Sequence, residues 1–268
     1  MAFNPNELII ERVRAVEEYN IKTNELEGRY TQIEDPSLTT SKDGTDVQDA
    51  WGATIATFYK NPQANFSFSN SLFSLDLAAS QFGTKKVIAD SANKIKVPVS
   101  ETIAIGTDGV VELKAVPVGT EGAEVQFVKI INKNNTFEET YKVSTEASAE
   151  NKTFTVDAAN KKITMPEGVE GKVFVNYVKE SENAVSVVNK SDATPEIKRL
   201  VIHAIMCDPC DPTTKYAAQI IAERAQLDPS SVDLTLTMEG KHAASYLLKK
   251  EYCAEDDAKL FEIIISEN

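Results

Sequence analysis

The sequence has little of what disulfide scaffolds and membrane proteins require. It holds only three cysteines in 268 residues, too few and too clustered for a disulfide framework. No apolar run approaches the roughly 18 residues of a membrane-spanning helix. The first residues also lack the basic and apolar segments of a secretory signal. We therefore expect a chain that is made and folds in the cytoplasm and has no membrane partner.

Basic residues are scarce as well. Lys and Arg number 28 against 41 Asp and Glu, which gives a net charge of −13. Proteins that grip nucleic acid concentrate Lys and Arg on one face, so this balance argues against that class. It is compatible with a surface past which nucleic acid slides without sticking, although an acidic surface more often serves solubility alone.

Motifs that carry chemistry are sparse. The sequence has no phosphate-binding loop, no dinucleotide fingerprint and no GxSxG context for a nucleophile. The acidic segment 43–49 does not match the calcium-loop pattern. His203 lies in an apolar strand-like run and His242 lies beside a turn, neither next to a nucleophile. We predict that the protein is not an enzyme and has no cofactor.

The sharpest local motif is Cys207-Asp-Pro-Cys210. With His203 or His242 and with Cys253, it could supply four ligands to a zinc ion. A redox role would need a nucleophilic cysteine at a helix start in a βαβ frame, which the flanking sequence does not provide. Because no second CxxC or HxxxH pair is present, packed or idle thiols are the favoured interpretation. A metal site at Cys207, Cys210, His242 and Cys253 is the less favoured one.

The densest apolar stretch runs from Thr45 to Gly83 and contains the lone tryptophan and five phenylalanines. Residues 6–34 before it favour a β-hairpin, and the polar residues 37–46 favour a turn or long loop. Within the stretch the pattern predicts, in order, a strand over 53–59, a turn at Asn61-Pro62, a strand over 66–69, and a helix over 71–82 capped by Asn70 or Ser71 and ended by Gly83.

The character of the sequence changes from Ile95 to about Asn189. Short alternating segments recur there between Gly and Asn turn signals, which is typical of a small β-sandwich or barrel. The predicted strands are 95–105, 110–116, 123–132, 140–144, 153–157, 162–165, 172–179 and 184–188. The flanking polar stretches place a discontinuous core at 1–92 and 193–268, with an inserted immunoglobulin-like β domain at 93–192.

The last third of the chain mixes strand and helix signals. Residues 198–206 are a strong β run, and 232–238 alternate cleanly as a strand. Residues 216–227, YAAQIIAERAQL, are helical by propensity. The end, 260–266, is apolar enough for a central strand, whose partners we expect to come from 45–70.

Several segments are similar in sequence to one known group of proteins: NELIIERVRAVEEYNIKTNELEGRYTQIEDPSLTTS, DVQDAWGATIATFYKNPQANFSFSNSLFSLDLAASQFGT, DPCDPTTKY, VDLTLTMEGKHAASY and KLFEIII. They resemble the structural proteins of tailed bacteriophages, and among these the major tail (tail tube) proteins. The middle, with AVPVGTEGAEV and FTVDAANKKITMP, resembles the β domain that these proteins carry. YAAQIIAERAQL departs from the strand that the family would place there.

The resemblance implies a mainly β protein with minor α: a tail-tube-like β-sandwich or barrel core with one packed helix and an inserted small β-sandwich. It implies hexameric rings that stack into a tube, with the tape-measure protein and DNA in the lumen. Tail terminator or adaptor proteins would be further partners. An acidic lumen would let genomic DNA pass at ejection without specific binding. The protein would lie in the virion tail, assembled in the host cytoplasm.

In this interpretation the aromatic residues of the dense stretch are structural and intersubunit. The interface candidates are Trp51, Phe58, Tyr59, Phe66 and Phe68. Hairpins that are exposed in a monomer could close a barrel between subunits and so remove their edges. Two alternatives stay open: a capsid decoration or other virion surface protein whose working part is 95–189, and a zinc- or thiol-dependent enzyme that uses Cys207 and Cys210.

Overall fold

A computed structural model of the chain is mainly β with little helix, as predicted. It describes residues 7–132, 134–238, 240–251 and 259–267. The chain divides into two compact units: a core unit of Met1–Lys86 with Val187–Asn268, and an inserted unit of Val87–Ser186. The two boundaries each lie six residues before the positions predicted from the polar stretches.

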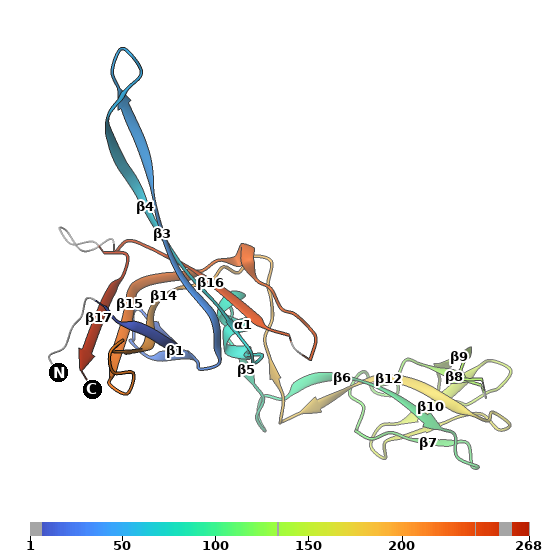
Figure 1. Cartoon of the computed structure of the whole chain (residues 1–268). Coiled ribbons are helices and arrows are strands. Elements are labelled where there is room, and N and C mark those ends of the chain that lie inside the picture. The colour runs from blue at the N-terminus through green and yellow to red at the C-terminus, as the bar shows by residue number, and fades with distance from the viewer. Residues whose placement is uncertain (1–6, 133, 239, 252–258, 268) are drawn as a thin grey trace. The chain divides into compact units, whose positions relative to one another are not determined.

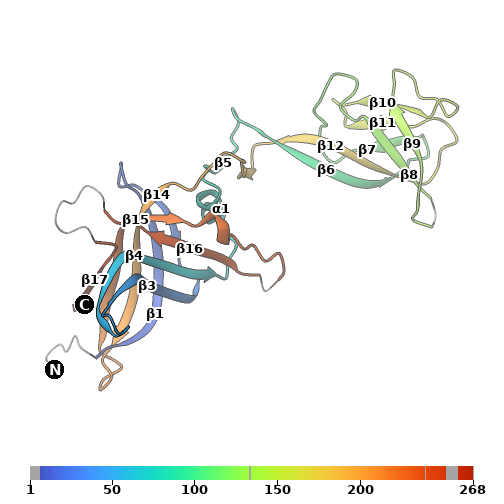
Figure 2. The same ribbon diagram turned by 90° about the horizontal axis from the view of Figure 1, so that it is seen from above.

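The core unit is built on an eight-stranded sheet. The strands follow the order β2-β1-β14-β15-β16-β4-β3, and β17 pairs with β15. The sheet curls into a nearly closed barrel (Figure 2). The strands are β1 (Ile9–Asn20), β2 (Leu26–Tyr30), β3 (Ile33–Gln48), β4 (Thr54–Asn70), β14 (Ile197–Cys207), β15 (Lys215–Leu227), β16 (His242–Leu248) and β17 (Glu262–Glu267).

Alternate residues of these strands form the barrel's apolar interior. Phe66 and Phe68 of β4 pack with Tyr246 of β16, and the rings of Phe68 and Tyr246 stack with centroids 6.2 Å apart. Leu200 and Ile202 of β14 line the same interior. Each fully buried large apolar side chain contributes about 1.5–3 kcal/mol relative to exposure, so this cluster is the main source of the core unit's stability.

The short helix α1 (Leu75–Gln81) packs against this interior through Leu77. It begins later than predicted because Ser74 is the N-cap and accepts a hydrogen bond from the Leu77 amide at 3.3 Å. The side chain of Asn70 is used elsewhere and donates to the carbonyl of Leu72 at 2.6 Å. Gly83 ends the helix with a left-handed backbone (φ +63°), as predicted.

Strands β3 and β4 are much longer than predicted. The polar segment 37–46 is strand rather than loop, and Asn61-Pro62 is a bulge rather than a turn. At the bulge the register shifts between Ser41 and Asp43, and Asn61 takes a positive φ of 53°. A bulge frees one residue from the ladder, so Pro62 needs no amide hydrogen there. The polar composition reflects solvent on both sides of the ribbon.

The helix predicted over 216–227 is also wrong, because this segment is strand β15. It pairs with β14 along its whole length, and with β17 and β16 on its other edge. Tyr216, Ala218 and Ala222 are buried in the interior. Tertiary pairing has overridden a modest helix propensity, in agreement with the strand that the tail-tube resemblance places here.

Two further predictions for the end of the chain are wrong. Residues 232–238 form no strand, since only Leu234 makes a bridge, to His242, and Leu236 is 88% exposed. A single turn, η1 (Pro229–Ser231), lies just before them. Strand β17 pairs with β15 instead of 45–70, and it lies at an edge with Ile263 and Ile264 exposed.

The inserted unit holds a seven-stranded sheet in the order β6-β12-β8-β9-β10-β11-β7. Its strands lie where the alternation predicts them, although the segment over 184–188 contributes only β13, which pairs with β5. They are β5 (Val87–Ile88), β6 (Ile95–Ala104), β7 (Val110–Glu112), β8 (Phe127–Ile131), β9 (Phe137–Val143), β10 (Thr153–Asp157), β11 (Lys162–Thr164), β12 (Lys172–Ser181) and β13 (Val185–Ser186).

The inserted unit has its own core, centred on Val111, Val128, Phe154 and Val173. One buried polar pair crosses two of its strands: the hydroxyl of Tyr177 donates to Glu101 at 2.5 Å.

Candidate assembly surface

Residues 41–63 form a two-stranded ribbon, here called the arm. Strand β16 pairs with β4 only from Ala64 onward, so β3 and β4 pair with each other alone along the arm. In Figure 1 the arm extends away from the rest of the core unit. At its tip the carboxylate of Asp49 accepts hydrogen bonds from the amides of Trp51 and Ala53, at 2.9 and 2.8 Å.

The arm carries large apolar side chains on both faces. Ile55 and Tyr59 lie on one face, and Phe58 lies on the other with Val47. All four are exposed, Tyr59 by 69% and Phe58 by 66%, and Trp51 at the tip is 95% exposed. An isolated two-stranded ribbon cannot bury such residues. Exposed apolar surface of this kind marks a protein contact.

The outer part of the arm, residues 43–59, is acidic as well as apolar. It has three aspartates and no Lys or Arg, whereas Lys42 and Lys60 flank it and Lys60 lies opposite Asp43 in the ladder. Asp43 accepts from the Asn61 side chain at 3.0 Å and Asp46 accepts from the Thr57 hydroxyl at 2.6 Å. These contacts hold the carboxylates in place.

The five predicted interface residues separate into two groups. Trp51, Phe58 and Tyr59 lie on the arm and are exposed, whereas Phe66 and Phe68 are 2% and 3% exposed in the barrel interior. The interior pair has almost no surface left to offer a neighbour. The difference follows from the bulge, beyond which β4 enters the barrel and one of its faces becomes core.

A buried charged cluster, which the sequence did not predict, is centred on Glu18. This carboxylate is fully buried and accepts from the Tyr246 hydroxyl at 2.5 Å. It also accepts from Ser80 and from Lys198, each at 2.7 Å. Lys198 extends on to Glu27 at 3.1 Å. The only sequence signal is that Glu18 follows core-facing Val16 by two residues, on the same face of β1.

The cluster shifts the pKa values of its members. Burial tends to lower the pKa of Lys198, but the charges of Glu18 and Glu27 outweigh it and raise that pKa above its usual value. Burial and the Glu18 charge raise the pKa of Tyr246 well above its usual value. These groups tie α1, β1, β14 and β16 together. We assign them a structural role, because Lys198, Tyr246 and Ser80 all donate to the buried Glu18 carboxylate.

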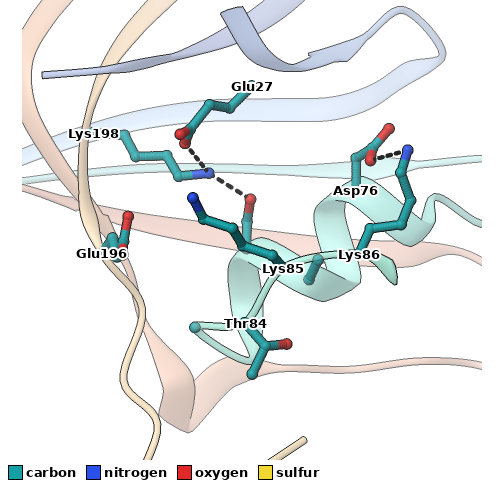
Figure 3. Close-up of a pocket in the computed structure, with 10 residues that line it drawn as sticks. Glu27, Asp76, Thr84, Lys85, Lys86, Glu196 and Lys198 are labelled. Carbon is teal, nitrogen blue, oxygen red and sulfur yellow. Dashed lines mark hydrogen bonds and ion pairs between the residues drawn. The ribbon is translucent and has the colours of Figure 1, made fainter. Parts of the chain in front are cut away.

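A pocket of about 240 Å³ lies beside this cluster (Figure 3). Lys198 points across it to Glu27 and Ser80, and Lys86 is paired with Asp76 at 2.5 Å. Lys198 and Lys86 are thus already paired with carboxylates that line the same pocket. The pocket therefore has little free positive charge with which to bind a charged ligand.

The proposed metal ligands do not come together in the described part of the chain, where no three candidate side chains cluster. Cys207 is buried at the end of β14, Cys210 is exposed, and Cys253 lies outside the described residues. His242 is buried with its Nε2 atom 2.7 Å from the side-chain oxygen of Gln81, and burial lowers its pKa. Its Nδ1 atom accepts from the Ser74 amide at 3.5 Å, so Nε2 is the atom that donates to Gln81. His203 lies on the opposite face of the sheet, 3.1 Å from Glu17.

The sequence model of the YomU/Tube protein family matches residues 8–263, a range that spans both units of the fold. The chain belongs to the YomU/Tube protein family. Its members are phage tube structural proteins, so this chain is a virion structural component of that kind. No curated protein matches the sequence. Among the described residues no helix is long and apolar enough to span a membrane.

Membership of the YomU/Tube family gives the arm a context. A tube is made of many copies, and each copy must offer surfaces that fit its neighbours. The exposed aromatic residues of the arm are the most prominent surface of this kind in the described core unit.

Proposed function

We propose that the chain is the subunit of a phage tail tube, in which six copies form a ring and rings stack into a hollow tube. The observation that carries the proposal is the arm, which is apolar on both faces and uncovered in the single chain. Together with the family match, this fits a protein whose fold is completed by neighbouring copies.

Two open strand edges support ring closure. The outer edge of β17 has no partner among the described strands, and residues 9–15 of β1 pair only with β14. Open edges expose amide and carbonyl groups that pair readily with another strand. If β17 of one copy faces β1 of the next, the contact is heterologous and repeats around a ring until it closes.

The charge of the subunit suits passage of DNA. At −13 per copy, an assembled tube carries a strongly negative field. DNA phosphates are repelled by such a field and find few cations to bind, so genomic DNA moves through the lumen at ejection. Tape-measure and tail terminator or adaptor proteins are the further partners in this proposal, and the tube is assembled in the host cytoplasm.

Native mass spectrometry of the purified protein tests the ring. We expect species built from six 29.4 kDa subunits and multiples of six. Dimers, trimers or tetramers as the end state would contradict the proposal. A monomer that binds only to capsids would favour the decoration alternative.

A further inference from the structure

We infer that the arm of one copy docks in a basic hollow on the barrel of a second copy. The inference rests on the proposed homo-oligomer and adds the surface that receives the arm. The hollow has a volume of about 520 Å³ and lies on the outer face of the barrel, across strands β1, β14 and β15.

The hollow is lined by both small residues and long charged residues. Ala15 and Ala217 contribute little side chain, and they come from β1 and β15. Two bulges in β1, between Ile10 and Arg12 and between Val13 and Ala15, change the alternation of that strand. As a result two pairs of consecutive residues, Glu11 with Arg12 and Arg14 with Ala15, line the hollow, although an unbroken strand gives one face only every second residue.

The carboxylates of the hollow are already paired. Glu11 holds Lys215 at 2.5 Å, and Glu17 holds Arg29 at 3.2 Å. Among the described residues Arg12 and Arg14 form no ion pair, and both are exposed. The hollow thus carries two surplus positive charges on a chain whose net charge is −13.

The arm complements this hollow in charge and in shape. Its outer part, residues 43–59, carries Asp43, Asp46 and Asp49 and no cation, while Lys42 and Lys60 lie at the barrel end of the arm. Its exposed Trp51 is large enough to need a hollow lined by small residues, and arginine guanidinium groups stack favourably on aromatic rings. In the single chain the arm extends away from the barrel (Figure 1), so the occupant is the arm of another copy.

Charge reversal on each side, followed by mixing, tests the contact. A hollow variant carries Arg12→Glu and Arg14→Glu, and an arm variant carries Asp43→Lys and Asp46→Lys. Like charges facing each other across an interface are strongly unfavourable, so we expect each variant alone to need about tenfold more protein to assemble, measured by light scattering and sedimentation.

Mixing the two variants is the decisive step. In the mixture the lysines of the arm variant meet the glutamates of the hollow variant, and the unchanged arm of the hollow variant meets the unchanged hollow of the arm variant. Alternating copies therefore restore both contacts, and assembly returns to near the wild-type concentration. A matched control, Lys142→Glu with Lys172→Glu, reverses two exposed lysines of the inserted unit and should assemble like wild type.

Two results would overturn the docking while leaving the tube intact: variants that assemble like wild type, or a mixture no better than its components. If the hollow variant assembles normally but loses binding to a duplex DNA probe, the hollow is a phosphate site instead. Failure of the wild-type protein to form rings at any concentration would contradict the tube proposal itself.

Discussion

At the scale of single residues, Glu18 connects the parts of the core unit. Substituting Glu18→Ala leaves Lys198 largely buried without its main partner. Removing one member of a buried ion pair costs about 3–5 kcal/mol of unfolding free energy. Urea titration followed by circular dichroism measures the loss.

The exposed pair Glu34–Lys241 supplies the control for that experiment. Glu34→Ala should reduce the unfolding free energy far less than Glu18→Ala does, because exposed pairs contribute little. Equal losses of unfolding free energy in Glu18→Ala and Glu34→Ala would mean that the buried Glu18 cluster stabilises the fold no more than an exposed ion pair does.

Glu27 makes stability depend on pH. Burial tends to raise its pKa, but hydrogen bonds from Asn20 and Lys198 outweigh that effect and lower the pKa below the usual 4.5. A lowered pKa stabilises the folded state above the unfolded value, and the contribution is lost as pH falls through the folded value. We therefore expect wild type to be more stable than Glu27→Gln at pH 7, with the difference vanishing in acid below pH 4.5.

The measurement is the urea midpoint of the two proteins across that range. A difference that persists unchanged at pH 3 would show that the carboxylate charge is not its source.

Lys198 makes stability depend on pH in the alkaline range. Its raised pKa stabilises the fold fully below the unfolded value of 10.5, and this contribution is lost as pH rises through the folded value.

The cysteine motif gives a third prediction at this scale. Cys207 is buried and Cys210 is exposed, and no third candidate ligand joins them in the described residues. We expect metal analysis to find no stoichiometric zinc, and the variant Cys207→Ser/Cys210→Ser to assemble like wild type. One zinc per chain, lost in the variant, would revive the metal-site alternative and would implicate Cys253.

At the scale of elements, we expect the arm to act in assembly and residues 64–70 of β4 to act in the barrel core. Trp51→Ala should leave the unfolding free energy unchanged within about 0.5 kcal/mol, since the side chain is 95% exposed. The same change should weaken assembly. Phe66→Ala should cost about 3–5 kcal/mol of unfolding free energy because it opens a cavity in the barrel.

Chemical denaturation and sedimentation velocity, applied to both variants, separate the two effects. Two results would contradict this prediction: Trp51→Ala destabilises the monomer as much as Phe66→Ala does, or Trp51→Ala assembles like wild type.

The sequence predicts elements well where pattern and burial agree. In the inserted unit, strands such as 153–157 match to the residue, because one face is core and the other is solvent. In the core unit, 37–46 look like loop because the arm is solvated on both sides in the single chain. Residues 216–227 look helical because their alanines fit a crowded barrel interior, and no local signal reveals the pairing with β14.

The candidate site was predictable in part for the same reason. Trp51, Phe58 and Tyr59 are exposed on the arm, as an interface residue must be, and their place in an interface stays a prediction. Phe66 and Phe68 were grouped with them because the bulge at Asn61 is not visible in the sequence. The hollow around Arg12 and Arg14 was missed, since it depends on two bulges in β1 and on residues more than 180 positions away in β14 and β15.

At the scale of the whole molecule, the core unit joins a self-contained barrel to a projecting arm and two open edges. The barrel has a buried core of its own, whereas the arm and edges would gain partners in the proposed tube. The inserted unit has a separate core and lies between Lys86 and Val187 of the core unit in the sequence.

If copies of this chain build a hollow tube, electron micrographs of the purified wild-type protein over a range of high concentrations should show it. We expect hollow tubes, with rings of six copies in end view. Single particles of one chain at every concentration would contradict it.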